Sequence, residues 1–485
     1  MNQNSEPTSK QVETDSQKNF SSKTSATNTT PLSTESYKGV RDFYPQEMVL
    51  QNHIFNTWRK VVESYGYEEY NASVLEPAEL YRAKSGDEIV NTQTYTFTDR
   101  GEREVTLRPE MTPTVARMVA ARRRELAYPL RWYSIPNLFR YEKPQRGRLR
   151  EFWQLNVDIF GVKSVQADVE LMAIAHDIML AFGLKDSDFE IRINNRKIIN
   201  YVLNDLLSLN EQTAHNLGKL IDKKDKMTVD EFKTKVHEIL PQENGEIANK
   251  FLTILNSKNF EEFVSHIGTT DESKEGIEEV RTALSSLEAL GITNAVFDQS
   301  IMRGFDYYTG MVFEVYDKHP DNRRAVFGGG RYDNLLGAFS GSNSENDTPV
   351  TGTGFGMGDA PIQNALESYG LIPKNKKHPD LYICVMPDLN DFGFAQDIAE
   401  KVRTEMSKEN AQGTRLSAAV DYSGKKIGDQ IKTADRKGAL CITVIGENEK
   451  ANGKFIIKEL SSGKEVPATE DTIAQVLNDI KLGKL

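Results

Sequence analysis

The sequence predicts an α+β protein that contains more than one domain, and three observations support this prediction. The chain has 485 residues, whereas a single hydrophobic core stops growing at about 250–300 residues. From residue 37 to residue 370, short strand-like runs are interspersed with helical patterns, and the stretch from about 191 to 293 is mostly helical. After residue 380, strand and helix patterns alternate, as is typical of a compact α/β domain.

Two polar segments mark the expected domain boundaries. Residues 1–36 are rich in Ser, Thr, Asn, Gln and Lys and contain almost no large apolar side chains. Because such a segment cannot bury enough surface to offset chain entropy, we expect a disordered tail. Residues 371–379 are short, basic and bounded by prolines, which favours a linker. We therefore expect one domain at 37–370, with the helical insertion at about 191–293, and a second at 380–485.

Hydrophobic periodicity predicts the elements of the first domain in order. A helix is expected from Pro45 to about Ser64, and another from Thr112, which would cap it, with Pro113 in its first turn. The other expected elements before the insertion are strands at 71–75, 94–98, 104–107, 130–138 and 150–160 and a helix at 165–182. The expected elements after it are strands at 295–299 and 311–316, a glycine-rich turn and helix at 328–336, and a second glycine-rich turn at 352–358 that leads into a helix near 362–369.

The second domain alternates between the two kinds of element. The expected order is strand 381–386, helix 392–406, strand 416–420, helix 425–436, strand 439–445, strand 454–459 and helix 471–480. Five basic residues fall on or beside the second of these helices: Lys425, Lys426, Lys432, Arg436 and Lys437. Such a helix suits contacts to RNA phosphates, and a solvated helix face is the alternative interpretation.

Composition excludes several classes of protein. The net charge of −11 argues against indiscriminate binding to DNA or to anionic membranes. No run of about 18 apolar residues predicts a membrane helix, and the N-terminus does not resemble a secretory signal. Cys384 and Cys441 lie in β-like apolar runs without a CxxC pattern, which favours two reduced thiols and a cytosolic protein.

Charge is distributed unevenly, and this leaves a local RNA-binding surface open. The segment from 117 to 150 is strongly basic, and its acidic residues are Glu125 and Glu142. Its basic residues are Arg117, Arg122, Arg123, Arg124, Arg131, Arg140, Lys143, Arg146, Arg148 and Arg150.

The octapeptide Arg303–Gly310 combines a cation, an acid, two tyrosines and two glycines in a segment predicted to run from a turn into a strand. Arginine offers a fixed fork of donors that suits phosphate and carboxylate. Tyrosine offers a flat wall with a hydroxyl at its edge. The segment therefore suits a pocket for an anionic ligand, and a polar surface hairpin is the alternative.

The sequence contains no phosphate-binding loop of the Walker type. Further candidate residues for binding a nucleotide lie instead at the ends of predicted strands. Segment 107–112 ends a strand with an acid and a hydroxyl, and segment 139–143 ends another with a cation and an acid. In the strand 151–158, alternation places four side chains on one face: Phe152, Gln154, Asn156 and Asp158. A nucleotide would therefore bind on a sheet with arginines, unless this face is merely solvated.

Together these strings resemble the class II aminoacyl-tRNA synthetases, and specifically the histidyl-tRNA synthetase family. The resemblance runs from about Tyr37 to the C-terminus. Three segments are similar to motifs of the class: Gly39–Pro45 to the family's entry motif, Leu75–Pro77 to the end of the first class motif, and 140–161 to the second class motif. Two further segments, Arg303–Gly310 and Gly328–Asp333, are similar to the two histidine-type signatures.

The resemblance implies a fold, an activity and partners. The fold would be the class II antiparallel sheet with flanking helices, a mostly helical insertion and a C-terminal α/β anticodon-binding domain. The activity would be that of a histidine–tRNA ligase, which uses ATP with Mg²⁺ to form histidyl-adenylate and charges tRNA(His). A cytoplasmic homodimer is implied, with no membrane or DNA partner. Two alternatives stay open: a non-aminoacylating paralogue that regulates histidine biosynthesis, and a class II enzyme of other specificity.

The resemblance also implies roles for individual residues. Arg140 and Arg303 would act on the α-phosphate and the substrate carboxylate. The implied histidine-binding residues are Glu110, Thr112, Gln154, Asp158, Tyr307 and Tyr308, and the implied ATP-binding residues are Arg140, Glu142, Arg148, Phe152 and Arg303. The third class motif normally brings an arginine to the second face of adenine, and the corresponding string Gly354–Pro361 contains none.

Overall fold

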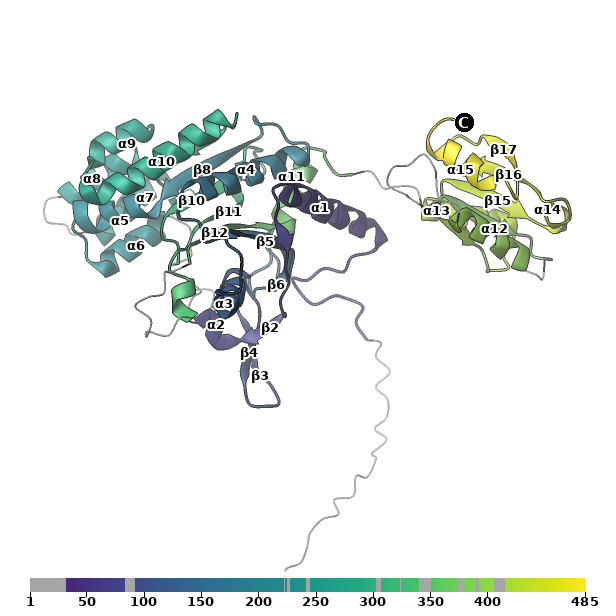
Figure 1. The fold of residues 1–485 in the computed structure, drawn as a ribbon, viewed down its shortest axis with the longest axis horizontal. Helices are drawn as coiled ribbons and strands as arrows, with labels where there is room; N and C mark the ends of the chain where they lie inside the picture. Colours follow the sequence, from purple (N-terminus) through teal and green to yellow (C-terminus); the bar gives the residue numbers. More distant parts are fainter. Residues whose placement is uncertain are drawn as a thin grey trace, which may run out of the picture.

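The computed structural model describes residues 32–82, 92–221, 223–224, 227–240, 245–301, 307–322, 324–339, 350–373, 378–389, 392–404 and 415–485. The described chain forms an N-terminal unit, which we define as α1 to α11 with their strands, and a C-terminal unit from β13 to α15 (Figure 1). Each unit has its own hydrophobic core. Of the expected tail 1–36, residues 1–31 lie outside the described residues, as do residues 374–377 of the expected linker.

A nine-stranded sheet of described residues organises the N-terminal unit. Its main path runs β1 (Glu68–Glu69), β5 (Leu130–Ser134), β7 (Glu151–Phe160), β12 (Gly352–Gly358), β11 (Ala325–Arg331), β10 (Met311–Asp317), β8 (Phe189–Asn195) and β9 (Ala295–Phe297), and β6 (Asn137–Phe139) pairs with β7. Every pairing from β5 to β8 is antiparallel. The two edge pairings are parallel. The predicted antiparallel sheet is thus confirmed for its central strands.

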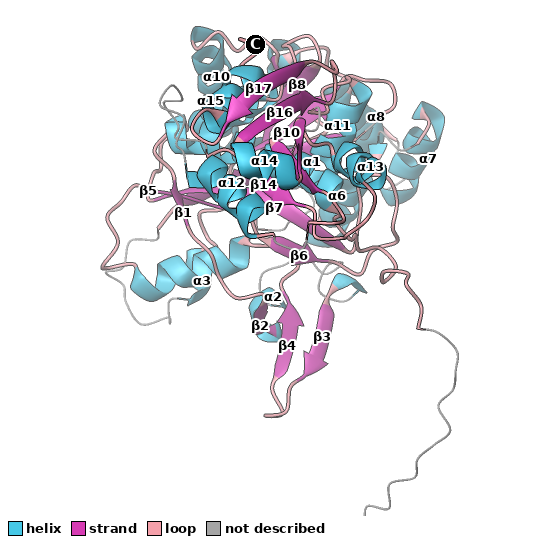
Figure 2. Ribbon diagram, turned by 90° about the vertical axis from the view of Figure 1, so that its right-hand side faces the viewer, coloured by secondary structure: helices cyan, strands magenta, loops and turns pink. Residues whose placement is uncertain are grey.

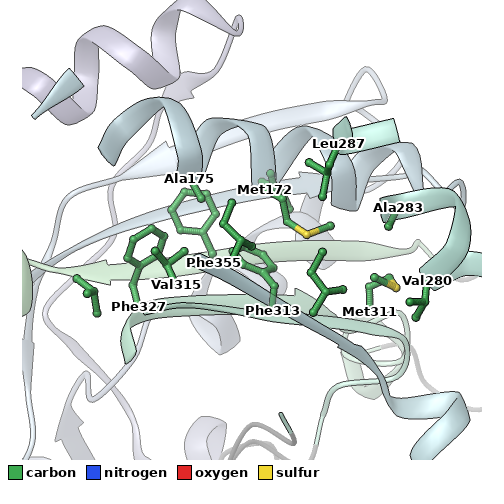
Figure 3. Close-up of a cluster of buried hydrophobic side chains, with 14 of the residues drawn as sticks. Met172, Ala175, Val280, Ala283, Leu287, Met311, Phe313, Val315, Phe327 and Phe355 are labelled. Atoms are coloured by element: carbon green, nitrogen blue, oxygen red, sulfur yellow. The ribbon is translucent and has the colours of Figure 1, made fainter. Parts of the chain in front are cut away.

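Helices cover one face of this sheet and bury the main core (Figure 1). They include α1 (Pro45–Ser64), α4 (Gln166–Ala181), α10 (Asp271–Ala289) and α11 (Asp359–Ser368). Figure 3 shows Met172 and Ala175 of α4 above Phe313 of β10 and Phe355 of β12, with Leu287 of α10 beside them. The bounds predicted for α1 are confirmed. They were readable in the sequence because the apolar residues of this segment recur at helical spacing.

A three-stranded sheet projects from the opposite side of the unit (Figure 2). Its order is β2 (Leu75–Pro77), β4 (Glu104–Leu107) and β3 (Tyr95–Thr98), and it adjoins α2 (Ala78–Arg82) and α3 (Thr112–Arg122). The prediction that Thr112 caps α3 is wrong. Met111 is the N-cap residue and makes no side-chain cap, whereas Thr112 is already helical.

The two glycine-rich segments are strands, and the prediction of turns is wrong. Glycine suggested turns because it tolerates positive φ, yet neither β11 nor β12 contains a positive-φ residue. The glycines provide space instead. A Cβ built on Gly354 would lie 2.2 Å from Oδ1 of Asp158 on the neighbouring strand β7. Glycine in a strand interior marks such close approach of a neighbour.

The predicted helical insertion begins later than expected. Residues 191–195 belong to β8 of the central sheet, paired with β10, so the helices begin at Arg196. The helices before α10 are α5 (Arg196–Asn200), a π-helical turn (Tyr201–Leu206), α6 (Glu211–Ile221), α7 (Val229–Ile239), α8 (Glu246–Leu255) and α9 (Phe260–Ile267). The apolar run 191–193 fits a buried strand as well as a helix, which explains the error.

The C-terminal unit is a separate α/β sandwich. Its sheet runs β14 (Ala418–Val420), β13 (Leu381–Val385), β15 (Cys441–Ile445), β16 (Lys454–Glu459) and β17 (Glu465–Thr469), with helices α12 (Gly393–Thr404), α13 (Ile427–Lys437), α14 (Glu447–Asn452) and α15 (Ile473–Lys481). Strand β17 and helix α14 were not predicted. Cys384 and Cys441 are buried free thiols, as predicted. Within the part of the chain that the structure describes, no helix has the length and apolar character needed to span a bilayer.

A buried ion pair connects the end of β11 to helix α4. Arg331 is 3% exposed and Asp168 is 2% exposed. Nε and Nη2 of Arg331 donate to Oδ2 of Asp168 at 3.0 and 2.6 Å. The same guanidinium donates to the carbonyls of Val162 and Ser164 in the β7–α4 turn. Thr353 of β12 donates to the other carboxylate oxygen, so the buried charges are paired and hydrogen-bonded.

Replacing Arg331 with alanine is expected to lower the free energy of unfolding of the N-terminal unit by about 3–5 kcal/mol, because a buried carboxyl loses its cation. Urea denaturation followed by tryptophan fluorescence measures this quantity, since Trp58, Trp132 and Trp153 all belong to that unit. The control Arg281→Ala removes ion pairs between exposed side chains and should cost no more than about 1 kcal/mol. Equal losses in the two variants would contradict the prediction.

Candidate active site

A cavity of about 260 Å³ opens on the face of β7, β11 and β12. This volume is close to the lower end of the range of small-molecule sites, roughly 300–1,000 Å³. Most predicted site residues line it: Glu110, Thr112, Arg140, Glu142, Arg148, Phe152, Gln154, Tyr307 and Tyr308. Asp158 is not among the lining residues. Arg303 lies outside the described residues.

Strand β7 divides its side chains as the alternation predicted. Phe152, Gln154 and Asn156 line the cavity, whereas Leu155 and Val157 belong to the hydrophobic core on the other side. The polar face of this strand is therefore part of the cavity wall. Asn156 lines the cavity without a predicted role, although its place on this face was visible in the sequence.

Glu110 is held in the segment between β4 and α3. It is 3% exposed, and the hydroxyl of Tyr307 donates to its Oε2 at 3.2 Å. The buried Tyr81 hydroxyl contacts the Glu110 carbonyl at 3.4 Å and Oγ1 of Thr114 at 2.9 Å. These contacts fix a carboxylate at the cavity wall, where it can accept hydrogen bonds from a cationic group of a ligand.

Arg140 follows β6 and faces the same cavity. Its Nε donates to the Pro109 carbonyl at 2.8 Å, which ties the guanidinium to the backbone next to Glu110. The guanidinium carbon lies 5.4 Å from the ring centroid of Phe152, within cation–π distance. Glu142 and Arg148 form an ion pair at 3.3 Å further along the loop. The cavity thus has two arginines and a flat ring, a combination suited to a nucleotide.

Three tyrosines form a second group at the cavity. The Tyr307 ring lies 5.0 Å from that of Tyr308 and 5.9 Å from that of Tyr332, measured between centroids. Tyr332 lines the cavity and donates its hydroxyl hydrogen to Oδ1 of Asp158. Asp158 is 3% exposed, and burial raises its pKa to about 7. The buried acid therefore contacts a residue of the cavity wall that was not predicted as a site residue.

Apolar groups provide the rest of the wall beside Phe152. They are Leu149, Ala325, Val326, Phe327, Ala360 and Pro361. Among the described lining residues, the cations are Arg140 and Arg148. Pro361 lies in the segment where the resemblance implies an arginine, and it is one of the lining residues.

Two protein-family models match this chain. Residues 39–358 match the family model described as histidyl-tRNA synthetase. The chain belongs to the histidyl-tRNA synthetase family. Residues 371–480 match a second model, the anticodon binding domain, which covers the C-terminal unit almost completely. The resemblance predicted from the two histidine-type signatures is confirmed.

Curated relatives cover nearly the whole chain. A histidine–tRNA ligase of Leptospira biflexa is 42% identical over 432 residues, which is 89% of this chain and 94% of the relative. A histidine–tRNA ligase of Halobacterium salinarum is 36% identical over 436 residues, with 89% and 95% covered. Histidyl-tRNA synthetase relatives of this similarity thus occur in both bacteria and archaea.

Solved structures of the family share the fold. The histidyl-tRNA synthetase from Nostoc sp. PCC 7120 superimposes with a TM-score of 0.75 at 22% identity, covering 93% of this chain and all of that one. An apo histidyl-tRNA synthetase of S. aureus has a TM-score of 0.63 at 24% identity, covering 91% of this chain and 99% of that one. The predicted class II architecture is confirmed by this similarity.

The raised pKa of Asp158 predicts how stability depends on pH. An unfolded aspartate has a pKa of about 4, so the folded protein holds an extra proton between about pH 4 and pH 7. The contribution of this group is therefore complete below about pH 4 and is lost as the pH rises through about 7. Asp158→Asn should reduce the loss of unfolding free energy between pH 5 and pH 8. Urea denaturation at the two pH values measures it, and identical pH slopes in the variant and the parent would contradict it.

Proposed function

We propose that the protein activates L-histidine with ATP and transfers the histidyl group to tRNA(His). The observation that carries this proposal is that Arg140, Phe152, Glu110 and the tyrosines all line one cavity. In the first step a histidine carboxylate oxygen attacks the α-phosphorus of ATP, and pyrophosphate leaves. In the second step a ribose hydroxyl at the tRNA 3′ end attacks the activated carbonyl, and AMP leaves.

The first step brings two anions together, so positioning and charge neutralisation matter more than proton transfer. Holding two reactants in place contributes about 7–11 kcal/mol in well-oriented systems. We assign Arg140 to the α-phosphate, supported by the Nε tether that fixes its guanidinium at the cavity. Arg303 takes the same role from the other side on the strength of the family resemblance.

The amino-acid end needs acceptors for an ammonium group. Glu110, Thr112 and Gln154 line the cavity and supply carboxylate, hydroxyl and amide oxygens. Tyr307 is tied to Glu110 and thereby joins the ammonium site to the group of tyrosines. We assign the ring of histidine to the tyrosine side, where the resemblance gives Asp158 and Tyr308 the task of hydrogen-bonding its two nitrogens.

The nucleotide end begins at Phe152, on which adenine would stack, and Arg148 would reach the phosphate tail. Mg²⁺ takes oxygen ligands and normally binds with substrate phosphates. Glu142 fits this requirement, because its carboxylate lines the cavity and its present partner Arg148 is half exposed. When bound there, the ion would neutralise phosphate charge.

We extend the proposal to assembly and location. The protein would act as a cytoplasmic homodimer, with a catalytic domain at 37–370, a linker at 371–379 and an anticodon-binding domain at 380–485. The basic residues of α13 would contact the anticodon arm. The regulatory alternative is disfavoured, because a module that only regulates biosynthesis has no use for the anticodon-binding match at 371–480.

Histidine-dependent exchange of pyrophosphate into ATP tests the activity directly. Of the twenty amino acids, only histidine is expected to support exchange, since a site that hydrogen-bonds both ring nitrogens rejects analogues without them. Charging of tRNA(His) transcripts tests the second step. Folded protein that shows no histidine-dependent exchange would sink the proposal, and exchange with another amino acid would reassign the specificity.

Arg140→Ala is expected to lower kcat/KM for exchange by about 10²–10³-fold, as when one preorganised donor to a transition-state charge is removed. Arg303→Ala should likewise slow adenylate formation far more than it weakens histidine binding. Pre-steady-state adenylate formation and equilibrium histidine binding give the two quantities separately. Equal loss in both would make either arginine a simple binding residue. Arg281→Ala, which alters exposed ion pairs of α10, is the control and should change neither.

A further inference from the structure

The helical insertion contacts the chain at both ends of the first histidine-type signature. At the downstream end, the backbone N–H of Arg196, the first residue of α5, donates to the Gly310 carbonyl at 2.9 Å. Just before the signature, Nε2 of Gln299 donates to the carbonyls of Leu255 and Ser257 at 2.7 and 3.0 Å. The insertion precedes the signature in the sequence, and these contacts bring the two together in the fold.

The two bonds of Gln299 cap the C-terminus of α8. Leu255 is the last residue of that helix, and the last carbonyls of an α-helix have no partner within the helix. The side-chain amide of glutamine carries two N–H donors, so one residue can satisfy both carbonyls. The end of α8 is thus closed by a residue that follows β9, 44 residues further along the chain.

Aromatic packing supports the same junction. The ring of Phe297, the last residue of β9, lies 4.9 Å from the ring of Phe260 and 4.9 Å from that of Phe263, measured between centroids. Both of these partners belong to α9 and are buried. Because β9 pairs with β8 of the central sheet, the rings hold the α8–α9 part of the insertion against the sheet, next to Gln299.

The backbone around Gln299 is tied to the sheet as well. Asn194 of β8 is fully buried, and its Nδ2 donates to the carbonyls of Gln299 and Ile301 at 3.3 and 2.9 Å. Ile301 belongs to the same buried cluster as Tyr308 of the signature. The side chain of Gln299 therefore contacts the insertion, whereas its backbone contacts the sheet and leads into the signature.

We propose that Gln299 is a positioning residue for adenylate formation, and that it uses the α8–α9 turn as the support that places the chain leading into Arg303. This inference rests on the proposed function and deepens it, because it gives the insertion a role in the first step. Gln299 touches no substrate in this scheme. It acts through Arg303, which is assigned to the α-phosphate and the substrate carboxylate.

The tyrosine end of the signature has supports of its own. Tyr307 donates to Glu110, and the Thr309 N–H donates to the Arg331 carbonyl at 2.8 Å. Loss of the Gln299 contacts should therefore disturb the arginine end of the signature more than the tyrosine end. The rate of adenylate formation, rather than the affinity for histidine, is the quantity that should respond.

The first test measures adenylate formation in single turnovers. Gln299→Ala should lower the rate constant about 5–30-fold, as for a small displacement of a catalytic group, and change the Kd for histidine less than about threefold. Asn294→Ala is the matched control, because Asn294 lies at the opposite end of β9 and its amide also donates to two carbonyls, those of Asp186 and Phe189. Equal losses of rate in the two variants would overturn the proposal.

The second test distinguishes hydrogen bonding from the filling of space. Glutamate has the shape of glutamine, but an ionised glutamate offers only acceptors. In Gln299→Glu this carboxylate would meet two carbonyls at the negative end of α8. The rate constant should therefore fall at least as much as in Gln299→Ala. A Glu variant with the rate constant of the parent would contradict the assignment to the two hydrogen bonds.

The third test asks whether Gln299 acts through Arg303. In the Arg303→Ala background, Gln299→Ala should cause a further loss of rate of less than about twofold, because the group that it positions is absent. Losses that multiply in full would show that Gln299 acts independently of Arg303, and the proposal would fail.

A variant on the insertion side keeps the proposal testable if the Gln299 variants do not fold. Phe263→Leu removes a ring that contacts Phe297 and should lower the rate constant of adenylate formation about 3–10-fold. Phe232→Leu is its control, because Phe232 is a buried residue of α7 within the same insertion. The control should leave the rate constant within about twofold of the parent. Equal effects of the two leucine variants would refute a role for the α8–α9 support.

Hydrogen–deuterium exchange separates this inference from the proposed function, because it does not require activity. The Ile301 N–H donates to the Asp298 carbonyl at 3.2 Å, and its exchange should be faster in Gln299→Ala than in Asn294→Ala. The same exchange rate in both variants would overturn the inference. Parent protein without histidine-dependent exchange of pyrophosphate would sink the proposed function, and faster deuterium exchange in Gln299→Ala would still show that Gln299 holds this segment.

Discussion

The buried pair of Arg331 and Asp168 is the contact on which the geometry of the cavity depends. One guanidinium holds helix α4 through Asp168 and the turn before α4 through two backbone carbonyls. Its own carbonyl accepts from the Thr309 N–H at 2.8 Å, next to Tyr308. The residue after it is Tyr332. The two histidine-type signatures, which are separate in sequence, therefore meet at the backbone and side chain of a single arginine.

Such a buried ion pair fixes the relative positions of the elements that it joins more than it stabilises the fold. Burying two charges costs several kcal/mol per ion before their attraction and their hydrogen bonds repay it. Here the guanidinium donates to Asp168 of α4 and to two carbonyls of the β7–α4 turn, so the arginine fixes the end of β11 relative to both. A site that distinguishes substrates by hydrogen bonds needs its donors and acceptors held closely. The ion pair between Arg331 and Asp168 provides that support at the face of the sheet that α4 covers.

Much of the scaffold was predictable because its signals are local. Helix α1 and strands β4 and β7 follow hydrophobic periods that packing does not override. The cavity-lining face of β7, with Phe152, Gln154 and Asn156, was predictable for the same reason. The strands β11 and β12 were missed because their glycines leave space for atoms of neighbouring segments. That requirement arises only when the strands pair, so it is not visible in the sequence. The contact of Tyr332 with Asp158 was missed likewise, because it depends on the pairing of β11, β12 and β7 across the sheet.

The glycines of β11 and β12 have a consequence for how the family can diverge. The space above Gly354 is filled by Asp158, that above Gly356 by Gln154 and that above Gly330 by Tyr308. A larger residue at any of these glycines would exclude the side chain that fills its space, and a smaller side chain in that space would leave a void over the glycine. Each of these glycines and the side chain that fills its space therefore form a coupled pair, and we expect a change at one position to be tolerated only with a matching change at the other.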